Sequence, residues 1–310
     1  MPQIFTVTLN PAIDVSTSVD TVEPVRKLRS GAVRRDPGGG GINVARVVRR
    51  LGGEVLAVYP AGGPIGALLE RLLAAEHLPS LSLPIAGDTR EDFTVVETST
   101  GREFRFVLPG PKLKPEEWQA CLAAVVRNGA EYLVASGGLP PGVPGDFHAQ
   151  LARHAKADGA KFALDCSGPA LKAALDEGVW LVKPNLSELE DYAGWPLEAQ
   201  DQQIAAARSI VLRGGAEIVA LTLGEAGALL VTERRAWRAP ALPIRRVSSV
   251  GAGDSFMGGL VFALASGLNL EDAFRYGVAA GSAALLFPGT ELAHAADIER
   301  LLPLVRVEAL

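Results

Sequence analysis

A chain of 310 residues can form one large α/β domain or two smaller ones, and 48% hydrophobic with 21% charged residues is ordinary for a globular protein. The 30 basic and 35 acidic residues give a formal charge of −5 without a basic stripe, which argues against nucleic acid as a partner. Two cysteines without metal-type spacing, Cys121 and Cys166, exclude a disulfide framework and favour a reducing, cytoplasmic location.

The predicted elements alternate between short β-branched strands and longer helices. The chain has no basic segment before its first apolar run and no apolar window long enough to span a bilayer, so we expect neither a signal peptide nor a membrane partner. Continuous apolar strands separated by helices predict an α/β fold with a parallel sheet covered on both faces. Strands are predicted at 4–9, 55–62, 132–136, 162–166, 179–185 and 218–224, and helices at 42–51, 64–76, 116–128 and 204–214.

Two segments interrupt this alternation. Residues 15–36 are polar, and residues 91–108 predict a hairpin that turns at 99–101. Neither has the pattern of a crossover helix, so we expect both to form a small β-sheet beside the main one. Because no repeat or low-complexity linker is present, we predict one domain over 1–310, with a lid made of insertions at about 15–36 and 88–109.

Polar and charged residues gather where the predicted strands end. In open parallel sheets, ligands bind beyond the carboxyl ends of the strands. The repeated position therefore predicts one ligand site at this edge of the sheet. The residues in this position are Asp14, Ser136, Lys183, Asn185, Thr222 and Gly224.

The run DPGGGGINVARVV, residues 36–48, leads four glycines directly into a predicted helix. Consecutive glycines lower stability through chain entropy, so the run favours a close approach of backbone to a neighbour over a flexible loop. It is no dinucleotide fingerprint, because Asn43 or Val44 stands where the last glycine is needed, and the chain has no P-loop motif. A nicotinamide dehydrogenase is therefore disfavoured.

A second glycine-rich turn, VGAGDS, opens an apolar helix and contains Asp254. The N–H groups of such a turn and the helix dipole form an anion site. Asp254 is either a helix cap, contributing about 1 kcal/mol, or a general base beside a phosphoryl group. The glycines favour the base, because a cap needs only the aspartate. The helix N-terminus predicts a low pKa for Asp254, which the loose transition state of phosphoryl transfer tolerates.

Two further sets of residues have alternative interpretations. Asn185 and Glu188 have the spacing of a capping box, which is the favoured interpretation of the pair alone, or they orient waters around Mg²⁺ carried by a nucleotide. Arg90, Arg105 and Lys27 belong to the predicted lid, where they are either solvated or bind a substrate phosphate through charge-assisted hydrogen bonds.

GGGGINVARVVRRLGG (38–53) and VSSVGAGDSFMGG (247–259), separated by KPNLSE and TLGEAGA, resemble the two signatures of the ribokinase/PfkB carbohydrate-kinase family. The resemblance covers nearly the whole chain. It implies a ribokinase-like three-layer α/β/α sandwich with a mostly parallel central sheet and a small β-sheet lid. Within the family the chain is most similar to the type 2 bacterial 6-phosphofructokinases. Gly40 stands where the 1-phosphofructokinases and tagatose-6-phosphate kinases usually carry a lysine.

The resemblance implies transfer of the γ-phosphate of ATP, carried with Mg²⁺, to O1 of fructose 6-phosphate. Asp254 would be the general base, and the amides of Gly251, Ala252 and Gly253 would form the anion hole. The resemblance further implies that the sugar hydroxyls are held by Asp14, Gly39 and Asn43 and that the 6-phosphate is bound by Arg90 with Lys27. Arg105 and Ser136 are the other implied substrate contacts. The implied nucleotide contacts are Lys183, Asn185, Thr222, Gly224, Gly227 and Ser282, with Glu188 and Asn185 on the waters of Mg²⁺.

The resemblance also implies a homodimer that clasps through the lid, with Lys27 reaching the neighbouring subunit's site. Phe287 and Glu291 stand where related type 2 enzymes carry a polar residue and an arginine, so a K⁺ requirement stays open. Some members bind a monovalent cation at the positions of Ser248, Val250, Ala284 and Gly289.

Two alternatives remain. A kinase for tagatose 6-phosphate or fructose 1-phosphate fits the same motifs, whereas an acceptor without phosphate would leave Arg90 and Lys27 without a function. A regulator that binds nucleotide or sugar phosphate on the same fold without catalysis belongs to another class. Asp254 argues against it, because a binding protein needs no base.

Overall fold

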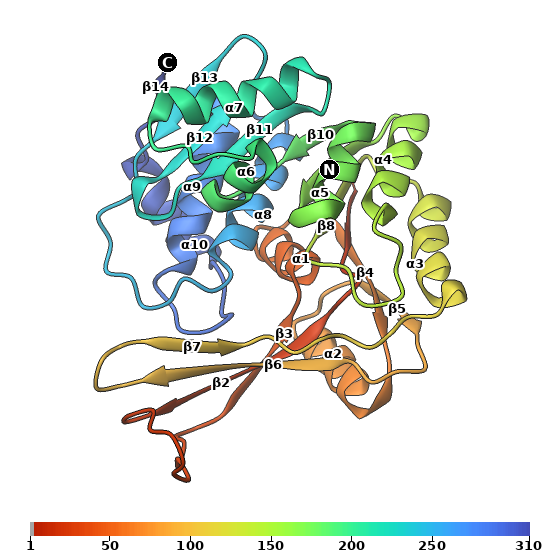
Figure 1. Cartoon of the computed structure of the whole chain (residues 1–310), viewed down its shortest axis with the longest axis vertical. Helices are drawn as coiled ribbons and strands as arrows, with labels where there is room; N and C mark the ends of the chain where they lie inside the picture. Colours follow the sequence, from red (N-terminus) through yellow and green to blue (C-terminus); the bar gives the residue numbers. More distant parts are fainter. Residues whose placement is uncertain (1–2) are drawn as a thin grey trace.

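The central layer of the computed structural model, which describes residues 3–310, is a ten-stranded sheet between two layers of helices (Figure 1). Its strands, in spatial order, are β14 (Glu308–Ala309), β13 (Ala236–Ala239), β12 (Ala228–Val231), β11 (Ala216–Thr222), β10 (Val179–Val182), β9 (Lys161–Asp165), β8 (Tyr132–Ser136), β1 (Ile4–Val7), β4 (Val55–Ala61) and β5 (Ser80–Pro84).

The sheet is parallel from β11 to β5, and β12, β13 and β14 add to it in antiparallel pairs. All six strands predicted from the sequence are present, which confirms the mostly parallel sheet. The strand predicted at 179–185 ends at Val182, so Lys183 and Asn185 lie beyond its carboxyl end. The buried run 228–231, which was not among the predicted strands, follows β11 through a short turn and forms β12.

Each face of the sheet is covered by five helices, and each has its own hydrophobic core, which gives the three-layer α/β/α sandwich. One layer contains α1 (Gly40–Arg50), α2 (Gly63–Ala75), α8 (Ala252–Ala265), α9 (Leu270–Ala284) and α10 (Ala295–Leu301). The other contains α3 (Pro115–Asn128), α4 (Phe147–Asp158), α5 (Gly168–Glu177), α6 (Leu186–Ala193) and α7 (Gln200–Leu212). The helices predicted from the sequence correspond to α1, α2, α3 and α7.

Helix α8 is buried between α1 and α9, which explains its apolar composition. Glycines permit the close packing on both sides. A methyl group at Gly259 would lie 2.6 Å from Ala280 Cβ in α9, and one at Gly258 would lie 2.9 Å from Val47 Cβ in α1. The glycine-rich turn that opens α8 is therefore fixed to the body of the protein by tight helix packing.

A separate four-stranded sheet projects from the body (Figure 1). Its strands follow the order β3 (Arg34–Gly38), β2 (Ala12–Val19), β6 (Arg90–Glu97) and β7 (Glu103–Phe106). It is the small β-sheet predicted as a lid, although β2 begins three residues before the predicted 15–36 and β3 ends two residues after it. Strands β6 and β7 form the predicted hairpin, whose turn closes through the Gly101 amide on the Glu97 carbonyl at 2.8 Å.

Within residues 3–310, no helix combines the length and the apolar character needed to cross a membrane.

Candidate active site

The carboxylate of Asp254 lies at the meeting point of three elements. Asn43, in the first turn of α1, donates from Nδ2 to Asp254 Oδ2 at 2.9 Å. Ser136, the last residue of β8, lies with its hydroxyl 3.4 Å from Asp254 Oδ1. Residues 43, 136 and 254 are thus brought together at the carboxyl edge of the sheet, although they are far apart in the chain.

The pKa of Asp254 is raised from 3.8 to about 6, so the low value predicted from the helix N-terminus was wrong. Burial of the carboxylate is the largest cause, and the negative charge of Asp165 adds to it. The hydrogen bond from Asn43 and the charge of Lys183 act in the opposite direction. Loss of water around the carboxylate therefore outweighs the favourable helix dipole.

Asp165, the last residue of β9, is a member of the site that the sequence analysis missed. Its Oδ2 lies 3.0 Å from Lys183 Nζ and 3.4 Å from the Ser136 hydroxyl. Burial would lower the pKa of Lys183, but Asp165 and Asp254 raise it above its usual value. The signal was available, because Asp165 follows a buried strand just as Ser136 and Thr222 do.

The glycine run before α1 packs against three strands, which confirms the expected close approach. A methyl group at Gly38 would lie 2.6 Å from the Asp14 carboxyl group, and one at Gly39 would lie 2.7 Å from the Thr8 side chain. At Gly40 it would lie 2.1 Å from Ser136 Oγ. Gly39 also has a φ of 108°, which favours glycine. Larger residues would push the strand ends apart.

The turn Gly251-Ala252-Gly253 forms the first turn of α8, directly before Asp254. First-turn amides have no carbonyl to bind within their own helix, so they are available to an anion. Gly251 adopts the left-handed conformation with a φ of 74°. A methyl group at Gly253 would lie 3.3 Å from Lys183 Nζ, which places that ammonium group beside the same turn.

Asn185 and Glu188 form the capping box of α6, which was the favoured interpretation of the pair alone. Asn185 Oδ1 accepts from the Glu188 amide at 2.9 Å, and Glu188 Oε2 accepts from the Asn185 amide at 2.8 Å. Burial and the negative charge of Asp165 raise the pKa of Glu188, against the opposing effect of the Asn185 amide. One oxygen of Glu188 is not used in the cap, and the charges of Asp165 and Lys183 both act on the carboxyl group.

The other predicted nucleotide contacts lie on elements around α6. Thr222 ends β11, and its amide donates to the Pro184 carbonyl at 3.0 Å, beside Asn185. Gly224 and Gly227 flank the short helical turn that follows β11, and both have a positive φ. Ser282 is buried in the last turn of α9. The structure thus groups Asn185, Thr222 and the two glycines.

The lid faces the body across a narrow cleft. Asp14, Asp92 and Arg105 line it from the lid, and Val250 and Gly289 line it from the body. The pKa of Asp14 is raised to about 6 by burial and by the charge of Asp92, while Arg105 acts to lower it.

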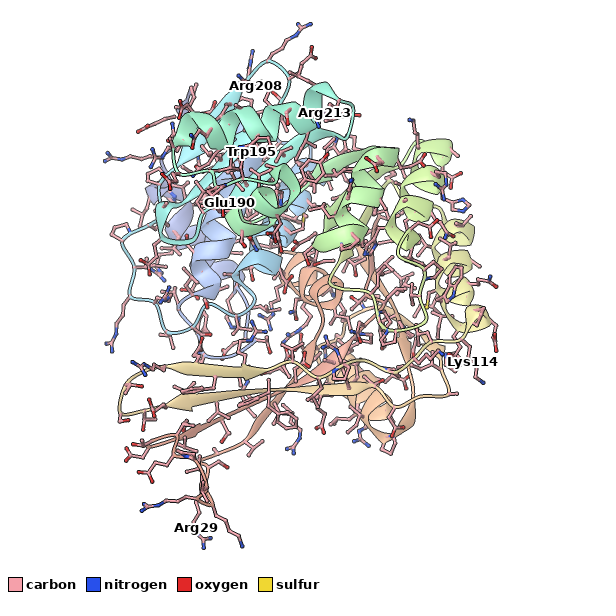
Figure 2. All side chains as sticks on the ribbon, in the orientation of Figure 1. Arg29, Lys114, Glu190, Trp195, Arg208 and Arg213 are labelled. Atoms are coloured by element: carbon pink, nitrogen blue, oxygen red, sulfur yellow. The ribbon has the colours of Figure 1, made fainter. Side chains whose placement is uncertain are left out.

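Arg90 and Lys27, the other two basic residues predicted for the lid, have surroundings that differ from those of Arg105. Arg90 is 13% exposed, and its Nη atoms donate to Asp92, to the Leu108 carbonyl and to the Asn10 carbonyl. Lys27 is exposed on the connection between β2 and β3. Arg29, on the same connection, points away from the body (Figure 2). Lys27 is not among the residues that line the cleft of its own chain.

The two segments that the resemblance associates with a monovalent cation lie side by side. The Val247 amide donates to the Leu285 carbonyl at 2.8 Å, which joins the segment of Ser248 and Val250 to the end of α9 that contains Ala284. Glu291 accepts from Arg34 Nη1 at 2.5 Å and lies 3.3 Å from His294 Nε2, whose ring contacts Phe287. Phe287 and Glu291 thus both contact His294, and Glu291 also pairs with Arg34.

In the part of the chain that the structure describes, no group of three or more His, Cys, Asp or Glu side chains has the arrangement of a metal site. Besides Asp254, the carboxylates whose charges act on Lys183 are Asp165 and Glu188. Two carboxylates without a closed cage suit Mg²⁺, which keeps several waters and is usually bound together with substrate phosphates. This donor set fits a metal ion that arrives with a nucleotide.

The profile of the pfkB family carbohydrate kinases matches residues 7–295. The ATP-dependent 6-phosphofructokinase isozyme 2 of Mycobacterium tuberculosis is 44% identical over 98% of this chain and 90% of its own length. The Escherichia coli isozyme 2 is 40% identical over 97% of this chain and 98% of its own length.

Solved structures of phosphofructokinase-2 from E. coli superpose on this chain with TM-scores of 0.92 and 0.93 at 39% and 40% identity. Each covers 98% of this chain and 99% of the other. One is a complex with fructose-6-phosphate, one is a complex with potassium, and a further one, also at a TM-score of 0.92 and 39% identity over 98% of this chain and 99% of the other, is a tetrameric inhibited form.

We expect Asp254 to be ionised above a pH of about 6 and protonated below it. Substituting Asp165→Asn removes a neighbouring negative charge and leaves Lys183 to pair with Asp254, and both changes lower the pKa of Asp254. Titration of ¹³C-labelled aspartate carboxyl groups by NMR measures this shift. The control Asp158→Asn, at the end of α4, should leave the titration of Asp254 unchanged. An Asp254 that titrates at the same pH in Asp165→Asn would contradict this electrostatic account.

Proposed function

The chain belongs to the pfkB family of carbohydrate kinases, and we propose that it transfers the γ-phosphoryl group of ATP to O1 of fructose 6-phosphate, giving fructose 1,6-bisphosphate. The observation that carries the proposal is the Asp254 carboxylate, half-buried at the turn that opens α8 and held by Asn43. A protein that only binds its ligands has no need of a carboxylate desolvated in this way.

Asp254 accepts the proton of the O1 hydroxyl as the new O–P bond forms. Its pKa of about 6 leaves it ionised at neutral pH and makes it a stronger base than an exposed aspartate. The transition state of phosphoryl transfer is loose, so the proton is transferred late and the base requires correct placement more than high basicity. Asn43 and the Ser136 hydroxyl supply that placement from opposite oxygens of the carboxylate.

The turn of Gly251, Ala252 and Gly253 holds the transferring phosphoryl group. Its amides and the positive end of α8 stabilise the negative charge on the phosphoryl oxygens. Lys183 lies beside this turn and adds a buried positive charge, which Asp165 keeps in place. Thr222, Gly224, Gly227 and Ser282 belong to the nucleotide side in this proposal.

Mg²⁺ bound to the nucleotide would supply positive charge to the phosphate oxygens, and Glu188, Asn185 and Asp165 would hold its waters. Because Asn185 Oδ1 and one oxygen of Glu188 are used in the capping box, the second oxygen of Glu188 is the one available to a water. We extend the proposal to K⁺ at Ser248, Val250, Ala284 and Gly289, on the support of the E. coli complex with potassium and the adjacency of the two segments.

Asp14, Gly39 and Asn43 bind the sugar hydroxyls, and the 6-phosphate lies under the lid. Arg105 lines the cleft next to Asp14. Arg90 is not among the residues that line the cleft; its Nη atoms are bound to carbonyls and to Asp92, and its buried Nε has no partner among the described residues. Arg105 is therefore the phosphate ligand that this chain offers from its own lid, and Lys27 is offered to a neighbouring subunit.

The surroundings of Gly40 support fructose 6-phosphate over the two alternative acceptors. The position at which the related kinases usually carry a lysine is occupied here by a glycine packed on Ser136. A side chain at this position would displace Ser136, which is hydrogen-bonded to Asp254. The acceptor pocket is thus closed to that lysine by packing.

The face of the lid that points away from Asp14 carries a row of apolar residues. Phe93 and Phe106 are paired across β6 and β7 and are 37% and 54% exposed, whereas Val15, paired with Phe93 from β2, is buried. An exposed apolar sheet face is a site of association. We propose a homodimer through this face. A higher assembly, such as the tetrameric inhibited form of the E. coli protein, would need a further surface. The two free, buried cysteines support a reducing, cytoplasmic location.

The acceptor is tested by comparing kcat/KM for MgATP-dependent phosphorylation of fructose 6-phosphate, tagatose 6-phosphate, fructose 1-phosphate and free fructose. We expect fructose 6-phosphate to be preferred over each by at least about 10-fold: over free fructose because the 6-phosphate adds charge-assisted hydrogen bonds, and over the other two sugar phosphates because of the packing at Gly40. A preference for another acceptor would overturn the substrate assignment and leave the kinase assignment intact. Inactivity with all four would favour a binding protein without catalysis.

Substituting Asp254→Asn should lower kcat by about 10²- to 10⁴-fold, because the amide cannot accept the O1 proton. The affinity for MgATP, measured by calorimetry, should stay within about threefold of the wild-type value, because Asp254 lies on the acceptor side of the site. The matched control is Asp272→Asn, an aspartate in the first turn of the neighbouring helix α9. A variant with near wild-type turnover would exclude Asp254 as the general base.

Substituting Phe106→Glu should dissociate the dimer, because it places a charge in the apolar row. Sedimentation equilibrium measures the mass. Leu212→Glu, on the exposed surface of α7, is the control and should leave the mass unchanged. A dimer that survives Phe106→Glu unchanged would exclude the lid as the interface.

A further inference from the structure

Among the residues that the structure describes, Arg46 is the largest fully buried side chain, with an exposed fraction of 1%. It lies in α1, one turn after Asn43. A charge in the interior lowers stability unless it is paired and hydrogen-bonded, so its surroundings indicate what the charge is for. Neither the catalytic turn nor the capping box accounts for it.

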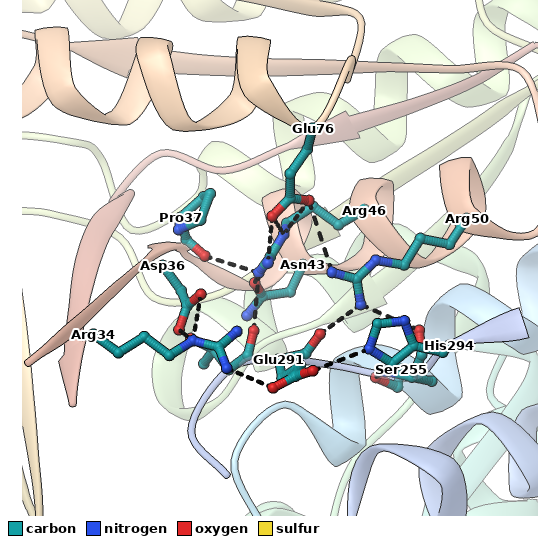
Figure 3. A network of polar contacts seen from close by, with 12 residues as sticks. Arg34, Asp36, Pro37, Asn43, Arg46, Arg50, Glu76, Ser255, Glu291 and His294 are labelled. Atoms are coloured by element: carbon teal, nitrogen blue, oxygen red, sulfur yellow. Dashed lines mark hydrogen bonds and ion pairs between the residues drawn. The ribbon is translucent and has the colours of Figure 1, made fainter. Parts of the chain in front are cut away.

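The guanidinium group of Arg46 joins four segments of the chain (Figure 3). Its Nε and Nη2 donate to the Glu76 carboxylate at 2.8 and 2.6 Å. Its Nη1 donates to the Pro37 carbonyl at 3.1 Å, to the Thr290 carbonyl at 3.1 Å and to Asn43 Oδ1 at 3.4 Å. Glu76 therefore balances the charge, and Nη1 faces three acceptors on the side of the catalytic cleft.

The contact with Asn43 fixes which way round its amide lies. With Oδ1 toward Arg46, Nδ2 is the atom that meets Asp254 Oδ2 at 2.9 Å. The flipped amide would place its NH₂ group against guanidinium N–H groups, and its oxygen against the Asp254 carboxylate. Both contacts would be repulsive, because arginine offers only donors and an ionised carboxylate only acceptors.

The same guanidinium group connects this amide to the lid. Pro37 belongs to β3, and Thr290 belongs to the segment between α9 and α10. Nearby, Arg34 of β3 binds Asp36 and Glu291, which ties the lid strand to that segment a second time (Figure 3). The orientation of Asn43 is therefore set by the junction of α1, the lid and the 285–294 segment.

We propose that Arg46 is a positioning residue for phosphoryl transfer, which holds the Asn43 amide in the one orientation that donates to Asp254. The inference rests on the proposed kinase function, and it adds a residue that contacts neither substrate in that function. Without Arg46, the amide would populate both orientations, and the carboxylate would lose its best-placed hydrogen bond for part of the time.

A purely structural role for the Arg46–Glu76 pair is the alternative, and a double-mutant cycle separates the two. The proteins are the wild type, Arg46→Lys, Asn43→Ala and the double variant, with Arg46→Met as a second substitution at the same position. Lysine keeps the charge but lacks the planar fork that reaches Glu76 and Asn43 together. It is therefore the variant expected to fold.

We expect Arg46→Lys to lower kcat for fructose 6-phosphate by about 10-fold, the order expected for a hydrogen bond to a charged group. KM for ATP should not change. In the Asn43→Ala background the same substitution should have no further effect on kcat, because the amide through which it acts is gone. Equal losses of kcat in both backgrounds would overturn the proposal, while the kinase activity of the wild type would still stand.

A second readout needs no turnover. The pKa of Asp254 responds to burial, to Asp165 and Asp14, which raise it, and to Lys183 and the Asn43 hydrogen bond, which lower it. Losing that hydrogen bond in Arg46→Lys should raise the pKa of Asp254 in the ¹³C titration. An unchanged titration would overturn the positioning role. A wild type without activity on any acceptor would overturn the kinase assignment instead.

Discussion

The site depends on one electrostatic constraint: two carboxylates, Asp254 and Asp165, are held at the same desolvated edge of the sheet with one lysine. Ser136 lies 3.4 Å from an oxygen of each carboxylate, and Lys183 binds Asp165 directly. The positive charge of Lys183 therefore stabilises the ionised form of Asp165 more than that of Asp254. Burial outweighs the effect of Lys183 on Asp254 and raises the pKa of Asp254 to about 6. Environment rather than residue type distinguishes the paired Asp165 from Asp254, the proposed base.

The glycines keep this arrangement compact. Gly38, Gly39 and Gly40 let the chain that leads into α1 pack against Asp14, Thr8 and Ser136, so that Asn43 reaches the Asp254 carboxylate. Gly258 and Gly259 do the same for α8 between its neighbouring helices. These glycines lie in two separate motifs, but both sets permit close packing around the same site. They bring the N-termini of α1 and α8 together over the ends of β1 and β8. Side chains at these positions would separate Asp254, the proposed base, from Asn43 and Ser136.

The lid completes the site from the other direction. Asp14 of β2 and Arg105 of β7 line the same cleft although ninety residues separate them in the chain, because β2 pairs in parallel with β6 and β6 pairs with β7. The junction of β3 with the 285–294 segment, through Arg34, Asp36 and Glu291, anchors the lid beside the catalytic turn. The residues proposed to bind substrate and to catalyse transfer are thus built on elements that are tied together by buried and partly buried charges.

The sequence by itself determined the alternation of strands and helices, the mostly parallel sheet, the lid hairpin, the position of Ser136 at a strand end and that of Asp254 at a glycine-rich turn into a helix. These follow from local periodicity and from glycines, whose effects act over a few residues. It left open whether Asn185 and Glu188 form a cap, and it gave the wrong direction for the pKa of Asp254. It also missed Asp165 and the role of Arg46. Only the tertiary structure decided these, because desolvation, the summed field of distant charges and the orientation of a buried amide depend on which segments pack together.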